Sequence, residues 1–214
     1  MKRLIIVGAG SLGRELYSWI RGAKEYQAEW SFYGFIDDNL KSLEGYPYKA
    51  EVIGSIQSYL PTKDDVFVLA IMQPKLKLHL AAQLEQRGAN FVSIVHETAL
   101  IADNVTIGKG SVICPRVVVS CDTRIGDFVT VNLSSTVGHD VKIGNGCTIN
   151  CHVDITGFVQ LGEGVLLGSH ASILQRVVVQ DFAVVGAGSV VLRTVEAGST
   201  VMGVPAKKLL GFNK

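Results

Sequence analysis

Aliphatic side chains recur every six residues through the second half of this chain. Sixteen consecutive positions follow the interval without a break, namely Ile101, Ile107, Ile113, Val119, Ile125, Val131, Val137, Ile143, Ile149, Ile155, Leu161, Leu167, Ile173, Val179, Val185 and Val191. Four residues after each of them stands a small or β-branched residue, from Val105 to Val195. An α-helix has a period of about 3.6 residues and a simple strand a period of about 2, so neither explains the pattern. A sustained period of six is typical of a hexapeptide β-helix, in which each hexad forms one short strand and a turn.

Three hexads close one triangular coil of eighteen residues in such a fold. Successive coils stack at the inter-strand spacing of roughly 4.8 Å, and the large aliphatic side chains point into the resulting prism. Residues eighteen apart in the sequence therefore become direct neighbours in adjacent coils. This relation predicts which polar side chains meet on the surface of the prism.

The first 95 residues follow a different pattern, in which strand-like runs alternate with helix-like runs. The strand-like runs are Lys2–Val7, Ser31–Ile36, Asp65–Ile71 and Phe91–Val95, and the helix-like runs are Leu12–Arg21 and Pro74–Arg87. Alternating strands and helices predict a small parallel α/β sheet of Rossmann-like type. We therefore expect a Rossmann-like domain over 1–95 and a β-helix domain over 96–214, whose tail from Met202 to Lys214 caps the last coil.

Composition and charge narrow the class of protein. Of the 214 residues, 48% are hydrophobic and only 18% are charged, which allows a large core. The formal net charge is +1 and there is no basic run, so nucleic acid is not an expected partner. The apolar start is too short for a signal peptide, and no apolar stretch is long enough to span a membrane. The four cysteines, Cys114, Cys121, Cys147 and Cys151, form no CxxC pair, which favours a reduced, cytoplasmic protein.

A glycine-rich turn follows the first strand-like run directly. Gly8, Gly10 and Gly13 form the sequence GAGSLG between a strand and a helix, where glycines allow a tight turn and the helix N-terminus favours a phosphate. The alternative is an ordinary α/β turn with no ligand. Asp37 and Asp38 follow the second strand and are placed either to bind a ribose hydroxyl or to solvate a turn.

His139 and Asp140 stand at a corner of the predicted prism, because Val137 and Val141 already occupy the inward positions. Adding eighteen to 139 gives Gly157, which should lie one coil away, about 5 Å along the stack. A neutral imidazole there is placed to accept a proton, and a glycine N–H is placed to bind the oxyanion of an acyl-transfer intermediate. Asp140 is placed to orient a histidine. The alternative is a surface histidine in a turn.

Two further pairs are also eighteen residues apart. His152 and His170 should stack on each other, and so should Asn132 and Asn150. Stacked histidines are open to three interpretations: metal ligands, part of a ligand groove, or a polar ladder on an exposed turn.

The whole chain resembles the two-domain, left-handed β-helix acetyltransferases of bacterial surface-sugar synthesis. This family includes sialic acid O-acetyltransferases and N-acetyltransferases of nucleotide-linked 4-amino-4,6-dideoxysugars, such as that of the bacillosamine pathway. The motifs that carry the resemblance are VGAGSLGRE from Val7, GFIDDN at Gly34–Asn39, VNLSSTVGHDVKIG at Val131–Gly144 and VMGVPAKKL at Val201–Leu209. The chain departs from the family at Leu12 and Thr148, where relatives carry histidines.

The resemblance implies a homotrimer with its active site between adjacent prisms. It gives His139 the role of general base, Asp140 that of its acidic neighbour, and the Gly157 N–H that of donor to the thioester carbonyl. It implies nucleotide-sugar binding by Gly8, Gly10, Ser11, Leu12, Asp37, Asp38 and Asn132. It implies acetyl-CoA binding by Thr148, Gly157, His170, Ala187, Gly188, Pro205 and Lys207. No metal is expected.

The hypothesis from the sequence is an acetyl-CoA-dependent N-acetyltransferase acting on a UDP- or dTDP-linked 4-amino-4,6-dideoxysugar. The nearest alternative is O-acetylation of sialic acid or a related sugar by the same residues. A metal-dependent hydratase of the prismatic carbonic anhydrase type would need three histidines at a subunit boundary. A non-catalytic nucleotide-sugar-binding protein and, last, an NAD-dependent oxidoreductase complete the alternatives.

Overall fold

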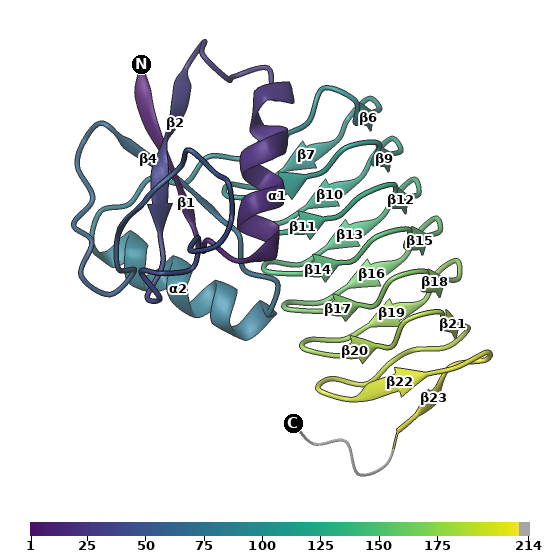
Figure 1. Ribbon diagram of the computed structural model, residues 1–214. Helices are drawn as coiled ribbons and strands as arrows, with labels where there is room; N and C mark the ends of the chain where they lie inside the picture. Colours follow the sequence, from purple (N-terminus) through teal and green to yellow (C-terminus); the bar gives the residue numbers. More distant parts are fainter. Residues whose placement is uncertain (210–214) are drawn as a thin grey trace.

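The computed structural model describes residues 1–209 and shows a small α/β domain beside a long parallel β-helix (Figure 1). The first domain contains the strands β1 (Lys2–Val7), β2 (Trp30–Ile36), β3 (Val52–Gly54) and β4 (Asp65–Leu69) and the helices α1 (Ser11–Trp19) and α2 (Pro74–Gln86). A 3₁₀ turn, Ile20–Gly22, continues α1. Neither helix among the described residues is long and apolar enough to cross a membrane.

The strands of the first domain form one parallel sheet in the order β3-β2-β1-β4. Its central strand is buried on both sides, as its continuous apolar sequence predicts. Leu4 and Ile6 share a core with Leu16 of α1, whereas Ile5 and Val7 share a different core with Leu84 of α2. The two helices therefore cover opposite faces of the sheet. The sequence did not predict β3, which is only three residues long.

The β-helix has three faces. The covered face carries β5 (Ile94–Val95), β8 (Val112–Ile113), β11 (Thr130–Val131), β14 (Thr148–Ile149), β17 (Leu166–Leu167), β20 (Val184–Val185), β22 (Thr200–Met202) and β23 (Lys207–Lys208). The second face carries β6 (Leu100–Ile101), β9 (Val118–Val119), β12 (Thr136–Val137), β15 (Asp154–Ile155), β18 (Ser172–Ile173) and β21 (Val190–Val191). The third face carries β7 (Thr106–Ile107), β10 (Arg124–Ile125), β13 (Lys142–Ile143), β16 (Gln160–Leu161) and β19 (Val178–Val179).

The predicted period is confirmed strand by strand. Each aliphatic hexad position is the second residue of a two-residue strand, and partners in adjacent coils are eighteen residues apart, as in Val137 and Ile155. These side chains are buried from Ile113 to Val191. Ile101 and Ile107 are only partly buried, because the first coil has no coil before it.

The segment predicted as the last strand of the first sheet, Phe91–Val95, is divided between the two domains. Phe91 forms a single bridge to Phe67 of β4. Ile94 and Val95 instead pair with Val112 and Ile113, so they form the first strand of the β-helix. The prediction of one continuous strand was therefore wrong.

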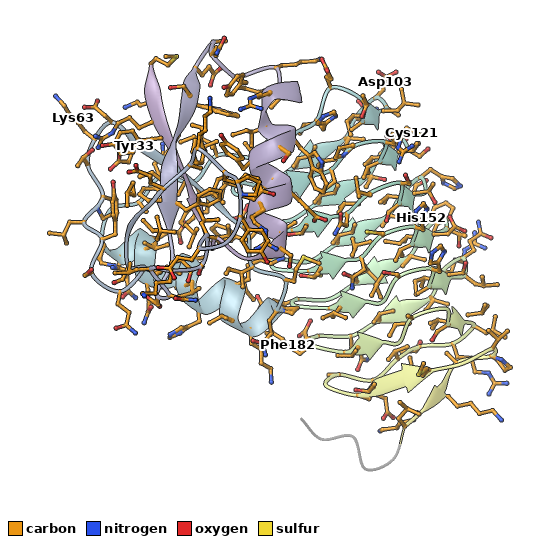
Figure 2. All side chains as sticks on the ribbon, in the orientation of Figure 1. Tyr33, Lys63, Asp103, Cys121, His152 and Phe182 are labelled. Carbon is orange, nitrogen blue, oxygen red and sulfur yellow. The ribbon has the colours of Figure 1, made fainter. Side chains whose placement is uncertain are left out.

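The first domain lies on the covered face of the prism. The side chain of Leu78 in α2 fills the space above Gly146, at the corner where the third and covered faces meet. Gly22, after α1, accepts a hydrogen bond from Glu97 N at 2.7 Å, where the covered face turns into the second face. The remaining corner, which joins the second and third faces, lies away from the first domain. In Figure 2, Phe182 lies beside α2, whereas Cys121 and His152, at the two ends of the second face, lie at the opposite edge of the prism.

The end of the chain closes the last coil. Val201 pairs with Val185 sixteen residues earlier, so this coil is two residues shorter than the others. β23 then turns back and pairs antiparallel with β22, which covers the free edge as the tail was predicted to do. Residues 210–214 of the predicted tail lie outside the described residues.

Candidate active site

His139 is held at the corner between the second and third faces, which we call the His139 corner (residues 138–141 and 156–159). Its Nδ1 lies 2.8 Å from Oδ2 of Asp140. A carboxylate only accepts hydrogen bonds, so Nδ1 carries a proton, and the neutral form of this imidazole has its lone pair on Nε2. The two side chains are 47% and 44% exposed, so the pair is open to a ligand.

Gly157 lies beneath the face of the imidazole at Nε2. A Cβ atom at residue 157 would stand 2.6 Å from Nε2 of His139, so only a glycine leaves room for the imidazole. Among residues 1–209 the Gly157 N–H has no hydrogen-bond acceptor. The predicted juxtaposition of a base and a free backbone donor is therefore present in one chain.

The glycine-rich turn and the acids after β2 also meet, at the carboxyl ends of β1 and β2. Asp37 accepts hydrogen bonds from the Ala9 N–H and the Asn39 N–H, both at 2.8 Å, so its carboxylate ties the two loops together. Gly13 allows the first turn of α1 to lie close to Gly8, because a Cβ at residue 13 would collide with the Gly8 carbonyl oxygen. Gly10 is open, with no atom within 4 Å of where its Cβ would be.

Gly10, Ser11, Asp38 and Asn39 are exposed in this region. Asp38 accepts a hydrogen bond from the Gln57 N–H at 3.2 Å. Ser11 is the first residue of α1, whose first turn contains no acidic side chain. A free helix N-terminus of this kind attracts an anion.

Two residues expected at ligand sites lie inside the protein instead. Leu12 is 5% exposed and belongs to the core of the first domain, so its side chain does not face a ligand. Thr148 is fully buried under α2, where it donates to the Met72 carbonyl at 2.7 Å and accepts from Lys77 Nζ at 2.9 Å. The expectation that Thr148 contacts acetyl-CoA is wrong, because the hexad period does not reveal which outer face the first domain covers.

Lys77 is a buried residue that the sequence analysis missed. Its Nζ also lies 3.1 Å from Thr130 Oγ1 and 3.1 Å from the Cys147 carbonyl, and its side chain is 1% exposed. Burial lowers the pKa of the Lys77 ammonium to about 7, with a small opposing effect of Cys147. No sequence signal marks it, because a lysine in a helix usually faces solvent.

The corner between the covered and second faces carries the other predicted residues; we call it the His152 corner. His152 and His170 stack as predicted, with ring centroids 4.9 Å apart and planes at 7°. Asn132, also expected at a ligand site, is buried at 6% exposed, and its Oδ1 accepts from the Leu133 N–H at 2.8 Å. Ala187 and Gly188 follow one coil beyond His170 and are exposed.

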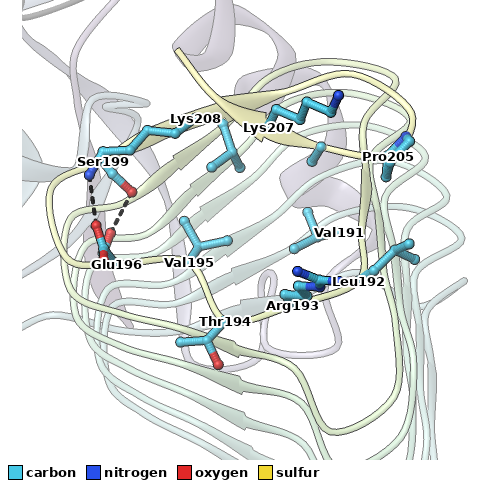
Figure 3. Close-up of a pocket in the computed structure, with 12 residues that line it drawn as sticks. Val191, Leu192, Arg193, Thr194, Val195, Glu196, Ser199, Pro205, Lys207 and Lys208 are labelled. Carbon is cyan, nitrogen blue, oxygen red and sulfur yellow. Dashed lines mark hydrogen bonds and ion pairs between the residues drawn. The ribbon is translucent and has the colours of Figure 1, made fainter. Parts of the chain in front are cut away.

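Pro205 and Lys207 lie at the C-terminal end of the prism (Figure 3). They line a hollow of about 480 Å³ together with the turn around Arg193 and Glu196. Lys208 forms an ion pair with Glu196 at 2.7 Å on its rim.

The predicted residues thus form two groups that do not meet within one chain. The glycine-rich turn, Asn132 and His170 lie on the side of the first domain, and His139 and Gly157 lie at the corner away from it. Across residues 1–209, no three histidine, cysteine or acidic side chains gather into a group that could hold a metal ion.

Comparison with known proteins agrees with this architecture. Residues 3–84 match the model of the PglD N-terminal domain family. A GDP-perosamine N-acetyltransferase of Escherichia coli O157:H7 is 32% identical over 140 residues, which are 63% of this chain and 61% of that protein. The chain therefore spans about three fifths of the length of that curated relative.

Two solved structures share the fold over nearly the whole chain. The acetyltransferase domain of PglB from Neisseria gonorrhoeae FA1090 superposes with a TM-score of 0.88, at 24% identity, over 98% of this chain and 100% of that one. PerB from Caulobacter crescentus, in complex with CoA and GDP-perosamine, gives 0.87, at 24% identity, over 98% of both. The resemblance to sugar acetyltransferases and the expected left-handed β-helix fold are confirmed.

Proposed function

We propose that this chain transfers the acetyl group of acetyl-CoA to the amino group of a nucleotide-linked 4-amino-4,6-dideoxysugar for bacterial surface glycans. The observation that carries the proposal is the imidazole of His139 with Nε2 over Gly157 and Asp140 at Nδ1. The names of the relatives support it, since two are acetyltransferases and PerB is complexed with CoA and GDP-perosamine.

The proposed reaction uses these three residues in two steps. The sugar nitrogen attacks the thioester carbonyl carbon, so that a C–N bond forms and the carbonyl oxygen becomes an oxyanion; the oxyanion then re-forms the carbonyl group as the C–S bond breaks. His139 Nε2 takes the proton that the nitrogen loses and passes it to the departing thiolate. Asp140 accepts from Nδ1–H and stabilises the imidazolium that forms, and the Gly157 N–H binds the oxyanion.

The nucleotide is proposed to lie on the first domain. Gly8, Gly10 and Ser11 form a turn at a helix N-terminus that suits a pyrophosphate, and Asp38 is exposed at the adjacent strand end. The sequence suggested UDP or dTDP. Because two relatives are named for GDP-perosamine, GDP is a third candidate.

A homotrimer is proposed because one chain does not bring the two groups together. The second face carries the exposed apolar side chains of Leu100 and Val118, and Leu174 and Leu192 stand beside it in later turns between the second and third faces. If this face lines a threefold axis, the His139 corner of one copy meets the His152 corner of the next. In this arrangement acetyl-CoA would lie between two copies and contact Gly157 of one of them.

The remaining acetyl-CoA contacts are proposed to lie along the groove between copies, from His170 past Ala187 and Gly188 towards Pro205 and Lys207. The four cysteines are free thiols, and the cytoplasm is the proposed compartment.

The test is release of free CoA thiol from acetyl-CoA with UDP-, dTDP- and GDP-linked amino sugars, matching hydroxy sugars and sialic acid. We expect turnover with an amino sugar, and a loss of about 10²–10⁴-fold in His139→Ala, the usual contribution of a general base. His79→Ala, an exposed histidine on α2, is the matched control and should retain full activity. A folded His139→Ala variant with normal turnover would refute the mechanism, and turnover only with hydroxy acceptors would refute N-acetylation.

A further inference from the structure

The ring of Phe158 packs against His139 at a right angle. The two ring centroids are 5.1 Å apart and the planes meet at 89°. Phe158 follows Gly157 directly and stands one coil beyond Asp140 in the same column of turn residues. It is 38% exposed, so burial in the core does not explain an aromatic side chain here. The edge-to-face arrangement is a favourable one for aromatic pairs.

Two other phenylalanines occupy the equivalent turn position and show what is different about Phe158. The ring of Phe128 covers Gly110, and the ring of Phe182 covers Gly164, in each case the turn residue one coil earlier. The turn residue before Phe158 is Asp140, which has a side chain and is bonded to His139. The Phe158 ring cannot cover a glycine there, and it lies against the imidazole instead.

Arg176 also contacts the ring of Phe158. It occupies the same column one coil further on, and its guanidinium carbon lies 5.0 Å from the centroid of the Phe158 ring. No carboxylate within residues 1–209 forms an ion pair with Arg176. A guanidinium on an aromatic face is attracted by the ring, so Arg176 favours one orientation of Phe158.

The imidazole is therefore restrained from three directions. Asp140 holds Nδ1, the backbone of Gly157 lies under Nε2, and the Phe158 ring fixes the plane of the imidazole. Without the ring, an exposed imidazole can rotate about its side-chain bonds and move Nε2 away from the Gly157 N–H. Displacements of about 1 Å in a reacting group can cost as much as 10²-fold in rate.

We propose that Phe158 is a positioning residue that, with Arg176 stacked on it, holds the imidazole of His139 over Gly157 for acetyl transfer. The proposal rests on the acetyltransferase function above. The hexad pattern alone does not predict this role for the residue that follows Gly157.

The test compares Phe158→Ala with Phe158→Tyr, which keeps an aromatic ring. We expect Phe158→Ala to lower kcat by about 10–100-fold with the KM for both substrates changed little, since only the alignment of the base is lost. Phe158→Tyr should restore most of the activity, and Arg176→Ala should give a smaller loss than Phe158→Ala. Phe182→Ala is the matched control, because it removes a phenylalanine from the same turn position far from His139.

Crystal structures of the wild type and of Phe158→Ala give a second readout that requires no substrate. We expect the His139 imidazole to be rotated or to occupy several orientations in Phe158→Ala, with the β-helix unchanged. An imidazole that keeps its place over Gly157, or a Phe158→Ala variant with normal kcat, would overturn the proposal. An inactive wild type with a well-fixed imidazole that is released in Phe158→Ala would instead contradict the acetyltransferase function and leave the positioning intact.

Discussion

At the scale of single residues, the contact between His139 and Gly157 makes a prediction about steric fit. Gly157 has an ordinary backbone conformation, so alanine is tolerated by the main chain and keeps the N–H. Its Cβ would nevertheless stand 2.6 Å from Nε2 and push the imidazole aside. We expect Gly157→Ala to reduce kcat by about 10²-fold with little change in melting temperature.

A double variant tests whether this loss acts through His139. If it does, Gly157→Ala should cause little further loss in a His139→Ala background, because residues that act as a unit are not additive. Independent losses that multiply in the double variant would contradict the steric explanation.

Lys77 predicts how the stability of the fold depends on pH. The pKa of its ammonium is lowered by burial to about 7, from 10.5 in an unfolded chain. Between these values the unfolded chain binds a proton that the native protein lacks, so this residue makes stability rise with pH across the window. Below about pH 7 both states are protonated, and the buried charge costs on the order of a few kcal/mol.

The measurement is the free energy of unfolding of the wild type and of Lys77→Met at several pH values between 6.5 and 10. The difference separates Lys77 from the buried thiol of Cys114, whose pKa is raised by burial and whose contribution to stability falls as pH rises. We expect Lys77→Met to be the more stable protein at low pH, with the difference shrinking as pH rises. A difference that is constant with pH would show that Lys77 does not change its protonation in this range.

These residues show which side-chain contacts could be predicted from the sequence. A spacing of eighteen was enough to place His139 over Gly157 and to stack His152 on His170, because stacking follows from the repeat itself. Phe158 was not singled out, because its contact with His139 depends on its rotamer. Lys77 and Thr148 could not be predicted, because their environment arises only when the domains dock.

At the scale of elements, α1 begins at the glycine-rich turn with an exposed N-terminus. Its first residue is Ser11, and no acidic side chain lies in its first turn. Ser11→Glu should stabilise the helix by roughly 0.3–1 kcal/mol, because a negative charge interacts favourably with the helix dipole. The same charge should repel the pyrophosphate of a nucleotide sugar.

Ser11→Glu is therefore expected to raise the KM for the nucleotide sugar at least about tenfold, with an equal or higher melting temperature and an unchanged KM for acetyl-CoA. Ser11→Gln has nearly the same shape without the charge and serves as the control. An unchanged KM in Ser11→Glu would place the nucleotide elsewhere.

The elements themselves were predicted to very different degrees. In the β-helix each hexad strand is specified locally by one aliphatic residue, so the strands from β6 to β21 were located correctly. In the first domain, β3 was missed because three residues carry no readable period, and its pairing with β2 depends on the rest of the sheet. Phe91–Val95 has the composition of one strand, but Phe91 pairs with β4 of the first sheet, whereas Ile94 and Val95 pair with β8 of the β-helix.

At the scale of the whole molecule, the central fact is that the two halves of the candidate site face different directions. The glycine-rich turn belongs to the domain on the covered face, and His139 lies at the corner away from it. Figure 1 shows the N-termini of α1 and α2 at about the level of β14 and β17 along the prism. This is close to the level of the coils that carry His139 and Gly157, so a neighbouring copy could supply the missing half without a shift along the axis.

Subunit mixing tests this arrangement. His139→Ala disables the prism half of a site, and Ser11→Glu disables the nucleotide half. In a trimer co-expressed from equal amounts of both variants, a site formed by two chains is intact when its prism comes from the Ser11→Glu chain and its first domain from the His139→Ala chain. Each condition is met half of the time, so about one quarter of wild-type activity is expected at low nucleotide-sugar concentration.

Sites contained within one chain would leave no intact site, and the mixture would show only the sum of the two residual activities. Mixing the separately purified trimers, without exchange of subunits, is the matched control and should show no recovery.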